Sequence, residues 1–181
     1  MLRNLVFTIL RVTGCEDKMG YQISIERQTL RAVFDIKGVE NAVASRLSGL
    51  GLALPSEKNS ISKTNDITLC WIGKDHWLVL APVEMETQLQ TSLTPDDPAL
   101  DCRVVLVSDV YAFFGITGPQ ANDIMAIASP LDTRLKTFPE NGATFSELFG
   151  IRALILRQPD GFTVAVERSY ADMIAAYFSK V

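Results

Sequence analysis

This chain of 181 residues lacks most of the patterns that mark a catalytic centre. It contains a single histidine, His76, so any Ser-His-Asp or Cys-His mechanism would depend on that one residue. His76 lies in the first predicted hairpin turn beside Trp77, a position where a histidine is typically solvated, and acid–base work needs a positioned partner. No G-x-S-x-G nucleophile elbow occurs either. The sequence therefore predicts no catalytic residue.

Cofactor and metal patterns are also missing. Neither G-x-G-x-x-G nor the P-loop pattern occurs, and Gly49-Leu50-Gly51 follows a predicted helix, the wrong context for a phosphate site. The three cysteines, Cys15, Cys70 and Cys102, show no C-x-x-C spacing. Acidic pairs such as Asp96-Asp97 lie in polar loops, where adjacent side chains need not converge on a metal. We expect no cofactor and no metal on this chain.

The chain has little positive charge and no long apolar run. Its net charge is −4, and its basic residues are scattered, whereas nucleic-acid binding needs clustered Lys and Arg. No stretch approaches the roughly 18 apolar residues of a membrane span. An odd number of cysteines without metal spacing favours reduced thiols. These observations predict a soluble cytoplasmic protein that binds neither nucleic acid nor membrane.

Residues 1–18 form an uncertain extension. Arg3, the apolar run Leu5–Leu10 and Cys15 loosely resemble a lipoprotein signal, but Arg11 ends that run before it reaches the usual length of about 7–15 residues. Two other interpretations remain, an extra N-terminal strand or a true start at Met19.

A repeated order of predicted elements runs through the rest of the chain. In each half, an apolar strand leads to a glycine, an amphipathic helix, two strands joined by a tight turn, and a final helix. Gly38 and Gly118 are equivalent and lie 80 positions apart, while the turn residues Asp75 and Asp160 lie 85 apart. The predicted strands are Leu30–Ile36, Thr68–Ile72, Trp77–Ala81, Val104–Val107, Ala112–Ile116, Ala153–Arg157 and Phe162–Val166, and the predicted helices are Val39–Ser48, Pro119–Ala128 and those that begin at Val83 and Tyr170.

This order predicts an α+β fold of pseudo-duplicated ββαββα units, about 20–93 and 102–180, within a single domain that spans 19–181. Such units can pair their sheets and bury the apolar faces of their helices against them. The polar stretches Ser56–Asp66 and Thr94–Asp101 are predicted to be loops, and Lys136–Thr144 a short insertion in the second unit. Ser169 and Asp172 resemble a capping box at the last helix.

A few residues are candidates for an interface or a structural motif. Phe113 and Phe114 are consecutive in a strand and face opposite sides of the sheet, so a partner is one possible cover for either face. Apolar residues gather around the predicted insertion, where local core packing is the alternative to an interface. Asp132 is predicted either to brace a turn or to mark a binding site. The candidates are Gly118, Pro119, Asp132, Phe138, Phe145 and Phe149.

The ordered series of motifs resembles the gamma subunit of heterotetrameric sarcosine oxidase. The segment Trp71–Pro82 (WIGKDHWLVLAP) resembles the hairpin signature of that family, and later motifs follow in the family's order, so that the resemblance covers roughly Tyr21–Phe178. One departure is His76, which stands where the family pattern has an acidic residue. The later motifs are Ile116–Pro119, Ser129–Asp132, Phe138-Pro139, Asp160–Phe162 and Arg168–Asp172.

The resemblance implies a noncatalytic subunit with ferredoxin-like halves packed as in the folate-binding domain of aminomethyltransferase, the glycine-cleavage T-protein. It implies larger partners, the alpha, beta and delta subunits, in a complex that oxidises sarcosine to glycine with tetrahydrofolate as the one-carbon acceptor. FAD, FMN, NAD and tetrahydrofolate then belong to the whole complex. A stand-alone folate- or ligand-binding module remains the alternative. A folate-dependent enzyme of its own would need a poised carboxylate, for which Asp109 and Asp132 are the candidates.

Overall fold

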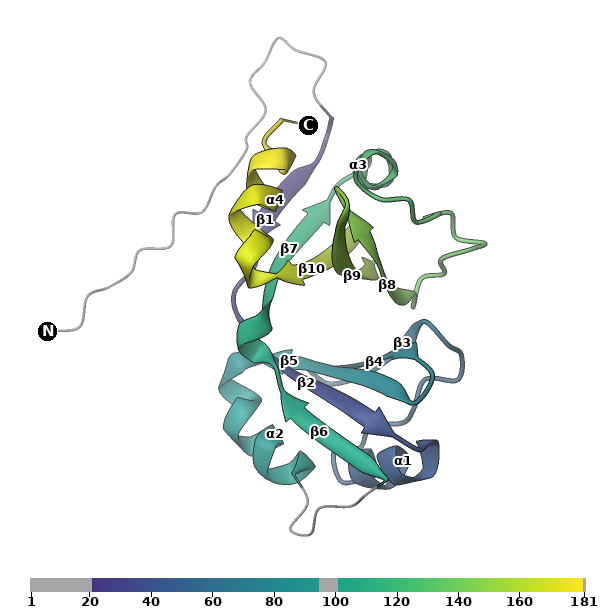
Figure 1. The fold of residues 1–181 in the computed structure, drawn as a ribbon. Coiled ribbons are helices and arrows are strands. Elements are labelled where there is room, and N and C mark those ends of the chain that lie inside the picture. The colour runs from purple at the N-terminus through teal and green to yellow at the C-terminus, as the bar shows by residue number, and fades with distance from the viewer. Residues whose placement is uncertain (1–20, 95–100, 181) are drawn as a thin grey trace, which may run out of the picture.

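The computed structural model describes residues 21–94 and 101–180; the predictions for residues 1–18, and for 95–100 of the central loop, lie outside them. The described chain forms two five-stranded antiparallel sheets and four α-helices, which confirms the α+β class. One sheet has the order β3-β4-β5-β2-β6 and the other the order β8-β9-β10-β7-β1. In Figure 1 the sheets face each other, with α1 and α2 beneath one and α3 and α4 against the other.

The two sheets repeat the same sequence of elements. The first half comprises β2 (Arg31–Gly38), α1 (Glu40–Ser48), β3 (Ser60–Thr64), β4 (Ile67–Gly73), β5 (His76–Pro82) and α2 (Glu86–Leu93). The second comprises β7 (Tyr111–Thr117), α3 (Ala121–Ala128), β8 (Ala143–Leu148), β9 (Ile151–Gln158), β10 (Gly161–Glu167) and α4 (Ala171–Phe178). The remaining strands are β1 (Ser24–Arg27) and β6 (Cys102–Leu106).

These two remaining strands are exchanged between the sheets. β1 precedes β2 in the chain but pairs with β7, at the edge of the second sheet, and β6 precedes β7 but pairs with β2. The registers are equivalent, since Arg27 lies opposite Phe114 and Leu106 lies opposite Phe34. Each sheet therefore takes its edge strand from the segment that introduces the other half.

The glycines at the ends of β2 and β7, Gly38 and Gly118, make room for the exchanged strands. A Cβ atom on Gly38 would lie 2.4 Å from the Asp101 carbonyl oxygen, and one on Gly118 would lie 2.6 Å from the Gln22 carbonyl oxygen. Gly118 also has a φ of +122°, a conformation that side chains rarely adopt. The repeated glycine is therefore explained by close backbone contact in both halves.

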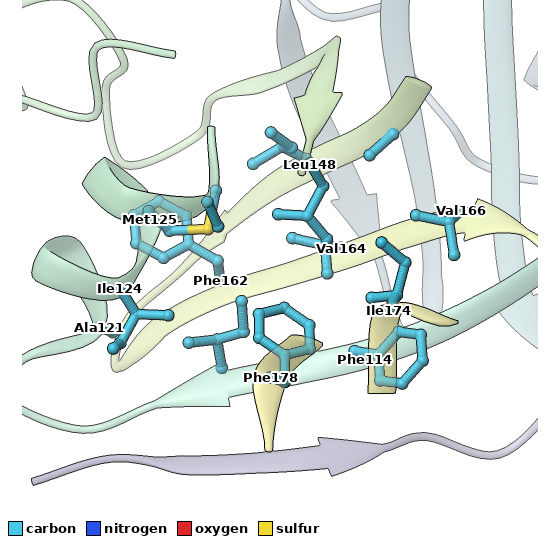
Figure 2. Packing of buried hydrophobic residues seen from close by; sticks show 14 of the residues in the cluster. Phe114, Ala121, Ile124, Met125, Leu148, Phe162, Val164, Val166, Ile174 and Phe178 are labelled. Carbon is cyan, nitrogen blue, oxygen red and sulfur yellow. The ribbon is translucent and has the colours of Figure 1, made fainter. Parts of the chain in front are cut away.

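Apolar side chains fill three layers, two between sheet and helices and one between the sheets. Figure 2 shows the layer in which α3 and α4 pack on the second sheet, with Phe114, Phe162 and Phe178 among its members. Phe113 faces the other way and packs between the sheets. Both phenylalanines are thus covered by the chain itself, and of the possible covers named for the two faces the partner is not the one that applies.

Two strands were mistaken for irregular segments. β3 lies within the predicted loop Ser56–Asp66. β8 begins at the end of the predicted insertion Lys136–Thr144 and continues past it, where no strand was predicted. They are equivalent edge strands, and their ends meet, since the Ile61 amide donates to the Asn141 carbonyl at 2.8 Å. An edge strand is only half covered, so it can carry polar residues such as Ser62 and Lys63. These polar residues weaken the apolar pattern by which a strand is predicted.

The helix starts also differ in detail from their prediction. The last helix has no side-chain cap, because Arg168–Tyr170 form a 3-10 turn and Asp172 instead pairs with Arg27 on β1 at 3.0 Å. The capping box is therefore wrong. The preceding prediction of a helix from Pro119 is early by two residues, since α3 begins at Ala121.

Candidate functional site

The connection from α3 to β8, residues 129–142, is an irregular loop that extends away from the sheets (Figure 1). Asp132 organises its outer part. Its carboxylate accepts hydrogen bonds from the Arg134 amide at 3.1 Å, from the Arg134 guanidinium at 2.6 to 3.1 Å, and from the Thr137 hydroxyl at 3.0 Å. The Arg134 carbonyl accepts the Thr137 and Phe138 amides at 2.8 Å each. The loop therefore closes on itself as a braced turn.

The charge on Asp132 is stabilised by the same contacts. Hydrogen bonds from the Arg134 guanidinium, with smaller effects of the Arg134 amide and Thr137, hold the pKa of this carboxyl well below its usual range. Asp132 consequently stays ionised and keeps the turn closed at neutral and mildly acid pH. It braces the turn, as one of the two interpretations of Asp132 predicted.

Arg157 holds the inner part of the loop. It lies on β9, is 8% exposed, and donates from Nε to the Phe138 carbonyl at 3.0 Å and from Nη2 to the Thr133 carbonyl. Its guanidinium carbon lies 4.9 Å from the Phe162 ring centroid and 5.5 Å from that of Phe138. Burial lowers the pKa of Arg157, with Glu140 opposing that effect. Within residues 21–94 and 101–180, no carboxylate lies within ion-pair distance of it.

Phe138 fixes the return of the loop to the core. It is 3% exposed and packs with the helix layer of the second sheet. A Cβ atom on Gly142 would approach its ring to 2.7 Å, so glycine is needed where the loop passes over Phe138. Leu135 lies between Asp132 and Phe138 in the chain, and its side chain is 61% exposed.

A recess of about 880 Å³ opens beside the loop. The loop forms one wall, and β3 and the end of β9 form the others. Three basic side chains and one acidic side chain line it, namely Lys63, Arg134, Arg157 and Glu140. The site is thus a projecting loop with an apolar tip next to a mainly basic recess.

The other candidates lie elsewhere. Gly118 serves the strand crossing, and the neighbouring Pro119 is exposed. Phe145 is partly buried between the sheets, with the Arg152 guanidinium 3.9 Å above its ring. Phe149 has a φ of +51° in the β8–β9 turn and contacts Tyr177 at 5.2 Å between centroids. Only Asp132 and Phe138 of the six belong to the braced loop.

Arg157 and Leu135 were missed by the sequence reasoning, although each carries a signal. Arg157 alternates with Ala153 and Ile155 on β9, and this period of two places a charged residue on a buried face. Leu135 is a lone apolar residue in the polar run 132–137. Such a run predicts a loop, and nothing in it reveals the hydrogen bonds that brace the loop.

Other titratable groups in the described part of the chain are paired, exposed or buried away from the loop. His76 begins β5, and its Nε2 lies 3.0 Å from Asp35 on β2, so it is half-buried and paired, contrary to the expected solvated turn. The Asp109 side chain is almost fully exposed. Burial raises the pKa of the Cys70 thiol to about 12. The described residues contain no group of three or more metal-ligating side chains.

None of the helices in the described ranges is long and apolar enough to cross a membrane. This finding agrees with their lengths of eight or nine residues.

Solved structures share this two-sheet arrangement. One is the heterotetrameric sarcosine oxidase from Corynebacterium sp. U-96 in complex with pyrrole 2-carboxylate, with a TM-score of 0.74 and 17% identity over 86% of this chain and 80% of the matched chain. Another is the glycine cleavage system aminomethyltransferase T from Bartonella henselae, with a TM-score of 0.63 and 16% identity over 86% of this chain and 45% of that protein. The comparison with curated protein sequences returned no match. The fold is therefore the two-half α+β scaffold of the aminomethyltransferase type.

The family is defined more closely by the sequence itself. The sarcosine oxidase, gamma subunit family matches residues 37–180. That range covers most of the chain and contains the braced loop and both repeated glycines. The chain belongs to this family, which confirms the resemblance found in its motifs.

Proposed function

We propose that this chain is the noncatalytic gamma subunit of a heterotetrameric sarcosine oxidase. The observation that carries the proposal is the family match over residues 37–180, supported by the shared fold. In this role residues 19–181 act as a single domain that assembles with larger alpha, beta and delta subunits. The complex converts sarcosine to glycine in the cytoplasm, with tetrahydrofolate accepting the one-carbon unit.

The cofactors of such a complex, FAD, FMN, NAD and tetrahydrofolate, are assigned to the assembly rather than to this chain. Between the two sheets, where the halves meet, the described side chains are mainly apolar and include Phe113, Leu78 and Leu154. Of the described cysteines, Cys70 is buried in this layer, where its raised pKa keeps it protonated. The polar pair His76 and Asp35 bridges two neighbouring strands, which is a structural arrangement.

The test is purification of the tagged chain from its native cells grown on sarcosine, followed by size-exclusion chromatography with absorbance at flavin wavelengths. We expect larger yellow polypeptides to co-elute with the chain and the pool to consume sarcosine. The chain expressed alone is the control and should be colourless and inactive. A colourless monomer or dimer from the native cells would contradict the proposal and favour a stand-alone folate- or ligand-binding module.

A further inference from the structure

The two halves provide an internal reference for the projecting loop. The equivalent connection in the first half, residues 49–59 between α1 and β3, lies against its own core. Its Leu52 is 4% exposed, and Leu50 and Leu54 pack on the same apolar cluster. In the second half Leu135 is 61% exposed in the corresponding connection. Both connections bury apolar side chains, and the second buries Phe138 and packs Leu131 on its core, but it also leaves Leu135 mostly in water.

Leu135 is held in this exposed position by the loop's own contacts. Arg157 fixes the carbonyls of Thr133 and Phe138, which stand on either side of it. Asp132 closes the turn through Arg134. A loop without such contacts would be free to fold its leucine back onto the protein and bury it. Fixing a side chain in its binding geometry before contact lowers the entropy lost on association.

The charges around Leu135 indicate what kind of surface fits it. Lys136 is exposed next to it, and Lys63 is exposed on the wall of the recess. With Arg157 in the recess wall and Arg134 balanced by Asp132, the basic groups outnumber Glu140. The chain as a whole carries a net charge of −4, so this basic area runs against the overall sign. A complementary surface has an apolar socket with carboxylates at its edge.

We propose that loop 129–142 is the element by which this chain docks onto a larger subunit of its complex. Leu135 inserts into an apolar socket of that subunit, and an acidic segment of the same subunit lies along the recess beside Lys63. The proposal rests on the proposed function, because a partner polypeptide is the occupant it commits to.

The test measures binding of the full chain to the co-expressed larger subunits, with wild type and variants compared by surface plasmon resonance. Leu135→Asp is expected to weaken binding by at least about 30-fold. This factor corresponds to about 2 kcal/mol of binding free energy, the loss typical of a central interface residue. Val39→Asp is the matched control. Val39 is 52% exposed in the other half and is the N-cap of α1, where aspartate is favourable, so its affinity should stay within about 3-fold of wild type.

The charge component is tested separately. Lys63→Glu should slow association by about 10-fold at low salt, and the difference from wild type should shrink at higher salt. Circular dichroism should show the same melting midpoint for Leu135→Asp and wild type, since Leu135 is mostly exposed. Leu135→Ala, with an expected loss of about 10-fold, provides a milder variant.

The outcomes separate the two proposals. If wild type binds the larger subunits and Leu135→Asp binds equally well, the docking loop is wrong while the subunit function stands. Dimerisation of wild type alone that Leu135→Asp abolishes, with unchanged binding to the larger subunits, would also overturn the docking proposal in favour of a second copy. If wild type binds no larger subunit, both the proposed function and the docking loop are wrong.

Discussion

At the two strand crossings the halves of the molecule agree closely. The Gly38 amide donates to the Asp75 carbonyl at 3.1 Å, and the Gly118 amide donates to the Asp160 carbonyl at 3.0 Å. At the connections between helix and edge strand they differ, since the leucines of the first pack on its core, whereas the second packs Phe138 on the core but leaves Leu135 61% exposed. Agreement between equivalent positions indicates what packing requires, and the difference marks a feature of the second half that packing of its core does not require.

One pair of equivalent positions explains how the difference arises. Trp71 on β4 lies opposite Trp77 and stacks on it, with centroids 6.0 Å apart. Arg157 on β9 lies opposite Phe162 and covers that ring in the same way. The indole of Trp71 donates locally to the Gly73 carbonyl at 2.8 Å, whereas the longer guanidinium reaches the loop carbonyls. An arginine at this position therefore ties the loop to the sheet.

The largest effect is expected where the halves are most alike. Phe34→Ala and Phe114→Ala each remove a nearly fully buried ring from equivalent helix-facing layers, and each should lower the free energy of unfolding by about 3 to 5 kcal/mol. Urea unfolding followed by fluorescence measures both. Val105→Ala, at an exposed site, should change stability by less than about 0.5 kcal/mol. A large difference between the two phenylalanine variants would break the equivalence.

The crossings come next. Gly118→Ala combines backbone strain with a clash against the Gln22 carbonyl and should destabilise by about 3 kcal/mol. Gly38→Ala has the clash without the unfavourable φ, so about 2 kcal/mol is expected. Gly49→Ala is the control, because open space surrounds its Cβ position and its φ is −63°. Urea unfolding measures the stability of all three variants. If Gly118→Ala were as stable as wild type, the explanation that Gly118 is needed for close backbone contact would be wrong.

Arg157→Met sharpens the contrast between the two loops. It leaves the Thr133 and Phe138 carbonyls without their charged donor and should destabilise the protein by about 2 kcal/mol. Hydrogen exchange should speed up at the Thr137 and Phe138 amides and stay unchanged in residues 49–59. Arg152→Met, an exposed arginine of the same strand, is the matched control. Unaltered protection of the two loop amides would show that Arg157 does not hold the loop.

The smallest effect concerns the acidity of Asp132. Because its pKa is lowered in the folded protein, the pair with Arg134 contributes fully above the ordinary aspartate pKa of about 3.9 and is lost as the pH falls toward the lowered value. A carbon-detected NMR titration of the carboxyl should give a midpoint well below 3.9. Arg134→Gln should move that midpoint back up. A wild-type midpoint near 3.9 would mean that the turn is not braced in solution.

Predictability followed the strength of local patterns. Strands such as β5 and β10 were found because their apolar runs are bounded by tight turns, and α3 because its buried positions recur at helical spacing. The edge strands β3 and β8 were missed because half-covered strands alternate weakly. In loop 129–142 Asp132 and Phe138 were singled out and Leu135 was not, and Arg157 on β9, which holds the loop, was also missed. Their roles depend on contacts between distant segments.

The sequence by itself determined the repeat, the α+β class and the family, because periodicity and ordered motifs are properties of neighbouring residues. The tertiary structure decided that β1 and β6 exchange sheets and that the chain covers both faces of the second sheet, at Phe113 and at Phe114. It also decided that loop 129–142 holds Leu135 outward while residues 49–59 pack their leucines on the core. These features arise from pairing between residues far apart in the chain. Local patterns are the same whichever free sheet edge a strand joins and whichever carbonyl a buried guanidinium reaches.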